Sequence, residues 1–180
     1  REEPLGAMAA IQDSIDGLGI RAAVHVQFAH RELLRGDEYE RHDANRVAEA
    51  VIGALAHNEL TVFLDNFTGI DRGYYFSGGL VDRLYNPLSG AHIVRHLHAA
   101  LPDGCQIGAV RENGNGRVIE LLKPIGALLL PATDAAAPTS APSRLTGRWI
   151  DLTSGNLAAE EPTGPTLVIP ECQTSSAHET

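Results

Sequence analysis

The sequence lacks several features that mark common functional classes. It contains no run of eighteen consecutive apolar residues, so it predicts no membrane-spanning segment. Lys and Arg total 14 against 23 Asp and Glu, which gives a net charge of −9, and the basic residues are scattered. Because nucleic-acid-binding proteins usually carry a basic face, that class is not expected. The first residues show no apolar core of a signal peptide, which slightly favours a cytoplasmic location.

Cysteine and aromatic residues are also scarce. The two cysteines, Cys105 and Cys172, fit no metal-binding spacing, so a disulfide and two separate thiols both remain open. No metal site and no cofactor is expected. Aromatic residues make up 5% of the chain, and the second half has one, Trp149. We interpret Trp149 as a core residue, because large aromatic side chains dominate the cores of small β domains.

The composition is that of a globular protein, with 43% apolar and 21% charged residues. The pattern changes near residue 102. Residues 1–102 alternate between helical and strand periodicity, whereas residues 103–173 show only short strands and turns and predict a small antiparallel β-sandwich. Residues 132–143, rich in Ala, Pro, Ser and Thr, predict an exposed, mobile linker, and residues 174–180 a disordered tail.

The first half predicts an α/β arrangement. Asp43 and Ser89 are candidate N-caps for its second and third helices. Alternating helices and strands favour parallel strands with crossover helices on one side of the sheet. The expected elements are a helix over 3–17, a strand over 22–28, a helix over 44–57, a strand over 61–67 and a helix over 89–101.

Two strands are too few for a stable parallel sheet, so we expect further strands upstream. In the first expected strand Val24, Val26 and Phe28 share one face, and in the second Val62, Leu64 and Asn66 do. The other face carries His25 and Gln27 in the first strand and Asp65 in the second. A β/α barrel tolerates polar side chains on its inner face near the carboxyl ends of its strands, where active sites lie. The alternation therefore favours the last units of a barrel.

The segment that follows the second strand, "NFTGIDRGYYFSGGLVDRLYNP", combines acids, arginines and tyrosines with glycines. Such a set suits a sugar or polyhydroxylated acid, because aromatic rings stack on C–H faces while charges bind hydroxyl groups. The candidate catalytic residues are Asp65, His30 and Glu32. The candidate substrate-binding residues are His25, Gln27, Asn66, Asp71, Arg72, Tyr74 and Tyr75.

Structural explanations stand beside these roles. His25 could be a core histidine, and Asp65 could accept backbone N–H groups of the following loop. The neighbours Asp71 and Arg72 could form a loop ion pair, as could Asp82 and Arg83. The tyrosines could pack beneath the loop.

The second half predicts about five strands. The segment "CQIGAVRENGNGRVIELLKP" contains two apolar runs around "ENGNG", which is a strong hairpin signal. Three further apolar runs, "GALLLPA", "RLTGRWIDLTSG" and "GPTLVIPE", predict the remaining strands.

The order of strand, helix, strand with "FLDNFTGIDRGYYFSGGLVDRLYNP", helix and a small β domain resembles the C-terminal part of (β/α)8-barrel glycoside hydrolases and related carbohydrate-acting barrels. The resemblance spans nearly the whole chain. It implies that residues 22–28 are strand seven, residues 61–67 strand eight and residues 86–101 the final helix. It also implies a carbohydrate or sugar-acid substrate.

The sequence departs from that family at one important place. The largest retaining clan has a nucleophilic Glu at the end of strand seven, where this sequence reads Gln27-Phe28-Ala29-His30, with Glu32 the nearest carboxylate. Hydrolysis normally needs two carboxylates, and the acid/base on strand four would lie upstream. We therefore expect this chain alone to be inactive. A sugar-acid enzyme such as a lactonase, and a carbohydrate-binding or structural β-sandwich module, are the alternatives.

Overall fold

The computed structural model describes residues 3–27, 37–65, 67–71, 76–77, 79–113, 115–132, 147–158 and 164–170. The described residues form three helices and nine strands. The elements are α1 (Pro4–Ile15), β1 (Ala22–Gln27), α2 (Asp37–Ala56), β2 (Leu60–Asp65), β3 (Ile70–Asp71), β4 (Phe76–Ser77), α3 (Ser89–Ala100), β5 (Gln106–Asn113), β6 (Gly116–Lys123), β7 (Ile125–Pro131), β8 (Gly147–Asp151) and β9 (Thr166–Pro170).

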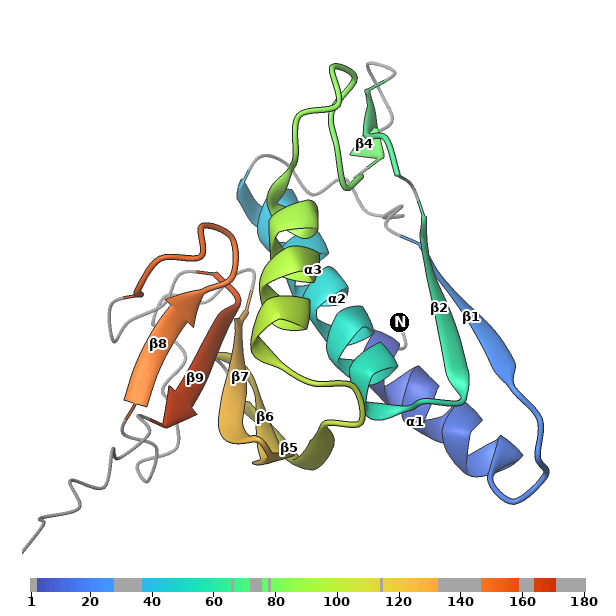
Figure 1. Cartoon of the computed structure of the whole chain (residues 1–180). Coiled ribbons are helices and arrows are strands. Elements are labelled where there is room, and N and C mark those ends of the chain that lie inside the picture. The colour runs from blue at the N-terminus through green and yellow to red at the C-terminus, as the bar shows by residue number, and fades with distance from the viewer. Residues whose placement is uncertain are drawn as a thin grey trace, which may run out of the picture.

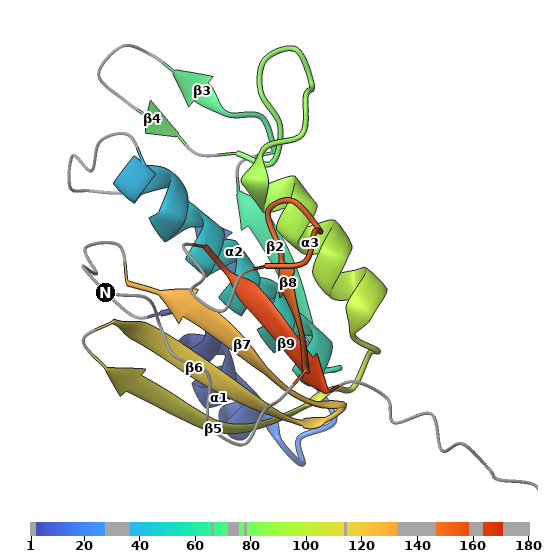
Figure 2. The same ribbon diagram turned by 90° about the vertical axis from the view of Figure 1, so that its left-hand side faces the viewer.

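The elements are arranged in three layers. In Figure 1 the sheet that contains β5 to β9 lies on one side, α2 and α3 lie in the middle, and β1 and β2 lie on the other side. Figure 2 looks onto the larger sheet, with α2 and α3 behind it and β2 behind the helices. Helices α2 and α3 therefore lie on the same side of the β1–β2 pair, as the sequence predicts. The chain is a mixed α/β fold.

Strands β1 and β2 pair in parallel, in a register that runs from Ala22 opposite Leu60 to Gln27 opposite Asp65. The parallel direction confirms the prediction from the alternating helices and strands. Apolar side chains of one face pack against α1 and α2 in a cluster built on Met8, Val26 and Leu60. This packing explains why both strands alternate between more buried and more exposed residues.

One predicted helix start and one predicted N-cap are wrong. Helix α2 begins at Asp37, so Asp43 lies within the helix and does not cap it. Helix α3 begins at Ser89 itself, after Leu88 in extended conformation, and no side chain caps its first turn. The start of α2 is missed because the apolar periodicity locates the buried stretch of a helix rather than its polar first turns.

The described strands of the second half form one antiparallel sheet in the order β5-β6-β7-β9-β8. The predicted hairpin is present, with Asn113 opposite Gly116. The architecture differs from the expected sandwich, because one face of this sheet packs on helices and the described residues contain no second antiparallel sheet beside it. The opposite face buries Val118, Leu129 and Val168, with Trp149 partly buried against them, which supports a core role for Trp149.

The main hydrophobic core contains side chains from both sides of residue 102. It joins α2 and α3 to the sheet, because fully buried Ile93 and Leu97 of α3 lie in one cluster with Ile119, Leu128 and Leu167 of the sheet. Cys105 is a buried free thiol in the same cluster, and burial raises its pKa. The first half and the sheet thus share a core.

No described helix combines the length and apolar character that crossing a bilayer requires. Residues 133–143 of the predicted linker, the predicted tail and Cys172 lie outside the described residues.

Candidate functional site

One face of the β1–β2 pair points away from the helices and carries the polar residues that the sequence singles out. Ala23, His25 and Gln27 alternate with the buried residues of β1, and Thr61, Phe63 and Asp65 do the same in β2. Phe63 is 57% exposed on this face. We call these six residues the open face.

Asp65 lies at the carboxyl end of β2, close to His25 and opposite Gln27 of β1. Its Oδ2 lies 3.6 Å from Nε2 of His25, and its backbone is in register with Gln27. The His25 and Asp65 side chains are 55% and 39% exposed, so this is a solvated pair rather than a buried one. The exposure rules out the alternative of His25 as a core histidine within the described chain. The pair can exchange a proton with a bound molecule and accept or donate hydrogen bonds.

The carboxyl ends of β1 and β2 point toward the β3–β4 hairpin, which lies beyond β2 in both views (Figures 1 and 2). Hairpin residues Ile70 and Asp71 pair with Ser77 and Phe76. The following loop returns to the strand end, because the N–H groups of Leu80 and Val81 donate to the carbonyl of Phe67. The hairpin therefore lies at the same edge as the His25–Asp65 pair.

Asp82 in this loop has a structural role. Its Oδ1 accepts hydrogen bonds from the N–H groups of Leu84 (2.7 Å) and Asn86 (2.8 Å), and its Oδ2 accepts one from the Asn86 side chain (2.7 Å). These bonds lower the pKa of Asp82, the Asn86 side chain contributing most. They hold a tight turn in which Tyr85 has a positive φ of 63°. The carboxylate of Asp82 is thus occupied by its own loop.

Of the predicted site residues, the structure describes His25, Gln27 and Asp65 with their side chains and brings them to one strand end. The backbone of Asp71 lies in β3, and its side chain is not described. The remaining candidates lie outside the described residues; they are His30, Glu32, Asn66, Arg72, Tyr74 and Tyr75.

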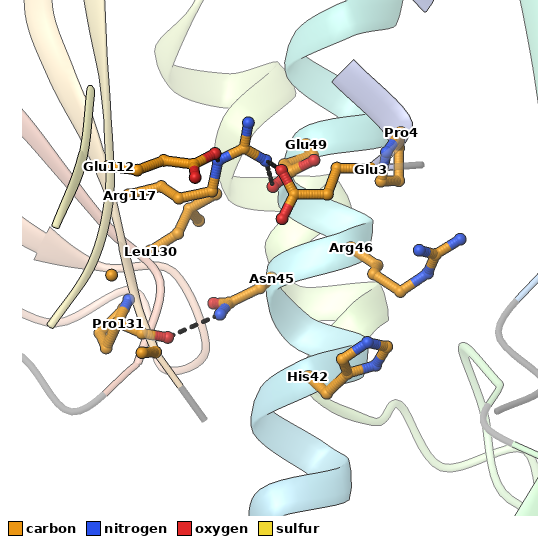
Figure 3. A pocket seen from close by; sticks show the side chains of 12 residues that line it. Glu3, Pro4, His42, Asn45, Arg46, Glu49, Glu112, Arg117, Leu130 and Pro131 are labelled. Atoms are coloured by element: carbon orange, nitrogen blue, oxygen red, sulfur yellow. Dashed lines mark hydrogen bonds and ion pairs between the residues drawn. The ribbon is translucent and has the colours of Figure 1, made fainter. Parts of the chain in front are cut away.

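A second group of charged residues was not predicted. A cleft of about 380 Å³ lies between α2, the start of β6 and the end of β7. Figure 3 shows Arg117 of β6 pointing toward Glu49 of α2 in this cleft. Nη1 of Arg117 lies 2.5 Å from Oε1 of Glu49 and also pairs with Glu3, while its Nε lies 3.0 Å from Glu112. We call these four residues the Arg117 cluster.

Glu49 is the buried member of the cluster, with only 4% of its surface exposed. Its second oxygen accepts a hydrogen bond of 3.4 Å from the N–H of Leu5 in the first turn of α1. Burial raises the pKa of Glu49, while the charge of Arg117 opposes the rise. The cluster joins α1, α2 and β6, so its evident role is structural. The sequence carries no signal for it, because the Glu49–Arg117 partners are 68 residues apart.

Helix α3 carries a third polar group, which faces the turn after β8. Nδ1 of His96 lies 2.8 Å from the carbonyl of Leu152, so it must donate the hydrogen bond. Nε2 of His96 lies 3.1 Å from Nη2 of Arg95, which also lies 3.3 Å from Nδ1 of His92. The His92 and His96 rings stack with centroids 6.1 Å apart. This group fastens α3 to the sheet.

Within the described ranges, no three His, Cys, Asp or Glu side chains are grouped so that they could hold a metal ion.

Comparison with known proteins does not extend these observations. No known protein-family model matches the chain, and a search of curated proteins finds no similar sequence.

Proposed function

We propose that β1, α2, β2 and α3 are two consecutive units of a carbohydrate-active β/α barrel, and that the carboxyl ends of β1 and β2 form part of its sugar-binding rim. The observation that carries the proposal is that the described helices cover one face of the β1–β2 pair and leave the other face exposed. The helices pack on one face, while the other face presents His25, Gln27 and Asp65 beside exposed Phe63. In a barrel that second face lines the interior, and its carboxyl end lies at the active-site mouth.

The chemistry of the open face suits a polyhydroxylated ligand. Asp65 accepts hydrogen bonds from sugar hydroxyl groups, the Gln27 amide both donates and accepts, and His25 does either according to its protonation state. Phe63, one residue pair deeper, offers an apolar surface for a sugar C–H face. We assign Asp65 the role of orienting a substrate hydroxyl or acting as a proton acceptor, with His25 as its hydrogen-bonding partner.

Glycoside hydrolysis places a second carboxylate opposite the first. Asp65 is the only carboxylate on the described part of the open face. We therefore propose that this chain by itself binds sugars without hydrolysing them, and that hydrolysis belongs to a larger protein containing the remaining barrel strands. A sugar-acid enzyme on the same scaffold would use the same open face.

The test is a titration of the isotopically labelled chain with glucose, galactose and glucuronate, in which amide chemical shifts monitor binding. We expect saturable shifts at the open-face residues, and we expect Asp65→Asn to weaken them by roughly tenfold, the effect of losing a hydrogen bond to a charged group. Asp103→Asn is the matched control, since Asp103 is an exposed carboxylate between α3 and β5. Shifts that fail to saturate with all three sugars, or that survive Asp65→Asn unchanged, would count against the proposal.

The second candidate is a structural module. It is favoured by the core that the sheet shares with α2 and α3, which makes the sheet a support for the helices. A carbohydrate-binding role for the sheet itself has less support, because the described strands β5–β9 contain one aromatic residue, Trp149, and it is partly buried.

A further inference from the structure

We propose that Arg46 is a positioning residue of the candidate site, which holds the carbonyl group at the end of β1 and thereby fixes Gln27 opposite Asp65. Nη2 of Arg46 donates to the carbonyl oxygen of Gln27 at 3.3 Å, across 19 residues of sequence. Gln27 is the last residue of β1 and is in register with Asp65. The contact thus acts at the point where the chain leaves the strand.

Helix α2 is held firmly on the opposite side of Arg46. The amide of Asn45, the preceding residue, donates to the carbonyl of Pro131 at the end of β7, with a distance of 2.7 Å. Glu49, three residues later, binds Arg117 of β6. Figure 3 shows Asn45 and Glu49 directed toward the antiparallel sheet and Arg46 directed away from it. These two contacts restrain rotation of the helix. The backbone that carries Arg46 therefore has a fixed position relative to the sheet.

The hydrogen bond from Arg46 matters because, within the described residues, little else fixes the position of the carboxyl end of β1. Gln27 pairs with β2 alone within the described residues, and its side chain lies on the exposed face. An arginine suits the task, since its long stem packs along the helix while its planar head donates several hydrogen bonds. The alternative is that Arg46 only stabilises α2, in which case loss of its contact with Gln27 would leave the open face unchanged.

The experiment compares Arg46→Lys, Arg46→Gln and the control Arg148→Gln in the full chain. Arg148 is an exposed arginine on β8, in the antiparallel sheet. Three quantities are measured: the melting temperature, the chemical shifts of the Gln27 carbonyl carbon and the Asp65 amide, and the affinity for the sugar that the wild-type chain binds best. Only the sugar measurement rests on the proposed function.

We expect Arg46→Gln to shift the Gln27 and Asp65 resonances and to weaken sugar binding roughly three- to tenfold, the range set by the net contribution of one exposed hydrogen bond. Arg46→Lys, which keeps the charge and one donor at a time, should give a smaller change in both quantities. Arg148→Gln should change neither.

A lower melting temperature with unchanged Gln27 and Asp65 resonances would overturn the inference, since Arg46 would then stabilise only the helix. If Arg46→Gln does not fold, unchanged resonances in Arg46→Lys would overturn it in the same way. A wild-type chain that binds no sugar would contradict the proposed function, whereas the resonances would still decide whether Arg46 positions the strand end.

Discussion

At the scale of single residues, substitution of Asp65 distinguishes a functional role of its carboxylate from a structural one. Its contact with His25 is solvated, and even exposed ion pairs contribute only about 0–1 kcal/mol to stability. We therefore expect Asp65→Asn, which keeps the shape, to change the free energy of unfolding by no more than about 1 kcal/mol. Denaturant unfolding of the variant measures this. A large loss of stability with intact sugar binding would show that Asp65 only supports the fold.

Glu49 gives a prediction about pH. Burial raises its pKa above the ordinary 4.5, so the folded chain holds a proton on Glu49 more tightly than the unfolded chain does. This contribution to stability is greatest below the unfolded value and is lost as the pH rises through the raised value. Glu49→Gln resembles the protonated form and should therefore gain stability relative to wild type as the pH rises from about 4.5 to 7.

Urea denaturation of both proteins across that range checks the prediction for Glu49. Glu120→Gln is a suitable control, because Glu120 pairs with Arg111 in a far more solvated environment. A relative stability of Glu49→Gln that falls with rising pH would show that the pairing with Arg117 outweighs the cost of burial.

Asp82 should show the opposite dependence on pH. Its pKa is lowered below the ordinary 3.8, so its hydrogen bonds stabilise the folded chain above that value and are lost as the pH falls through the folded value. Asp82→Ala should thus lower the melting temperature at pH 7 and have a shrinking effect below about pH 3.8. Thermal melts at several pH values measure this, and an effect that does not vary with pH would contradict the role of the carboxylate charge.

The sequence predicts the strand-end residues better than the charged clusters for a physical reason. In a strand, side chains alternate with period two, so one polar residue on a known face places its neighbours as well. His25, Gln27 and Asp65 were found in this way. The Arg117 cluster depends on how the sheet docks on the helices, and no local pattern encodes the meeting of Glu49 with Arg117.

At the scale of elements, the sequence predicts which elements form and misses some of their limits. The strands from β5 to β9 follow apolar runs between turn residues, and all five are present. Helix α2 extends further toward its N-terminus than the apolar pattern indicates, because residues 37–43 are mostly polar. The docking of helices on one face of the sheet replaced the expected sandwich, since apolar residues on a strand do not specify whether a helix or a strand covers them.

Two glycines test the packing of these elements, because an alanine should destabilise the fold at one of them and stabilise it at the other. A Cβ added at Gly126 of β7 would lie 2.6 Å from the carbonyl oxygen of Val168 on β9, so Gly126→Ala should force the strands apart. We expect a loss of about 1–3 kcal/mol, as for other overpacked cores. A Cβ at Gly6 of α1 would meet nothing within 4 Å, so Gly6→Ala should stabilise the helix by about 0.5–1 kcal/mol.

Denaturant unfolding of both variants gives the comparison. Equal effects of Gly6→Ala and Gly126→Ala would mean that the β7–β9 approach is looser than the structure indicates.

At the scale of the whole molecule, the main core decides how the two halves depend on each other. Ile93 and Leu97 of α3 are fully buried in the same cluster as Ile119, Leu128 and Leu167 of the sheet. Separating the halves would expose both sides of this cluster to water at about 25 cal/mol per Å² of apolar surface. The Arg117 cluster would lose its partners at the same time. We therefore expect residues 1–102 and the sheet to unfold together.

The single tryptophan allows this cooperativity to be measured. Trp149 lies in β8, so its fluorescence reports on the sheet, whereas circular dichroism at 222 nm reports mainly on the three helices. Because the halves share one core, both signals should give the same denaturation midpoint and slope. Leu128→Ala, which removes buried side-chain volume from the shared core, should shift both midpoints equally, with a loss of about 2–5 kcal/mol. Two separate transitions, or a shift in the fluorescence midpoint alone, would show that the sheet is an independent module and would favour the accessory interpretation of the second half.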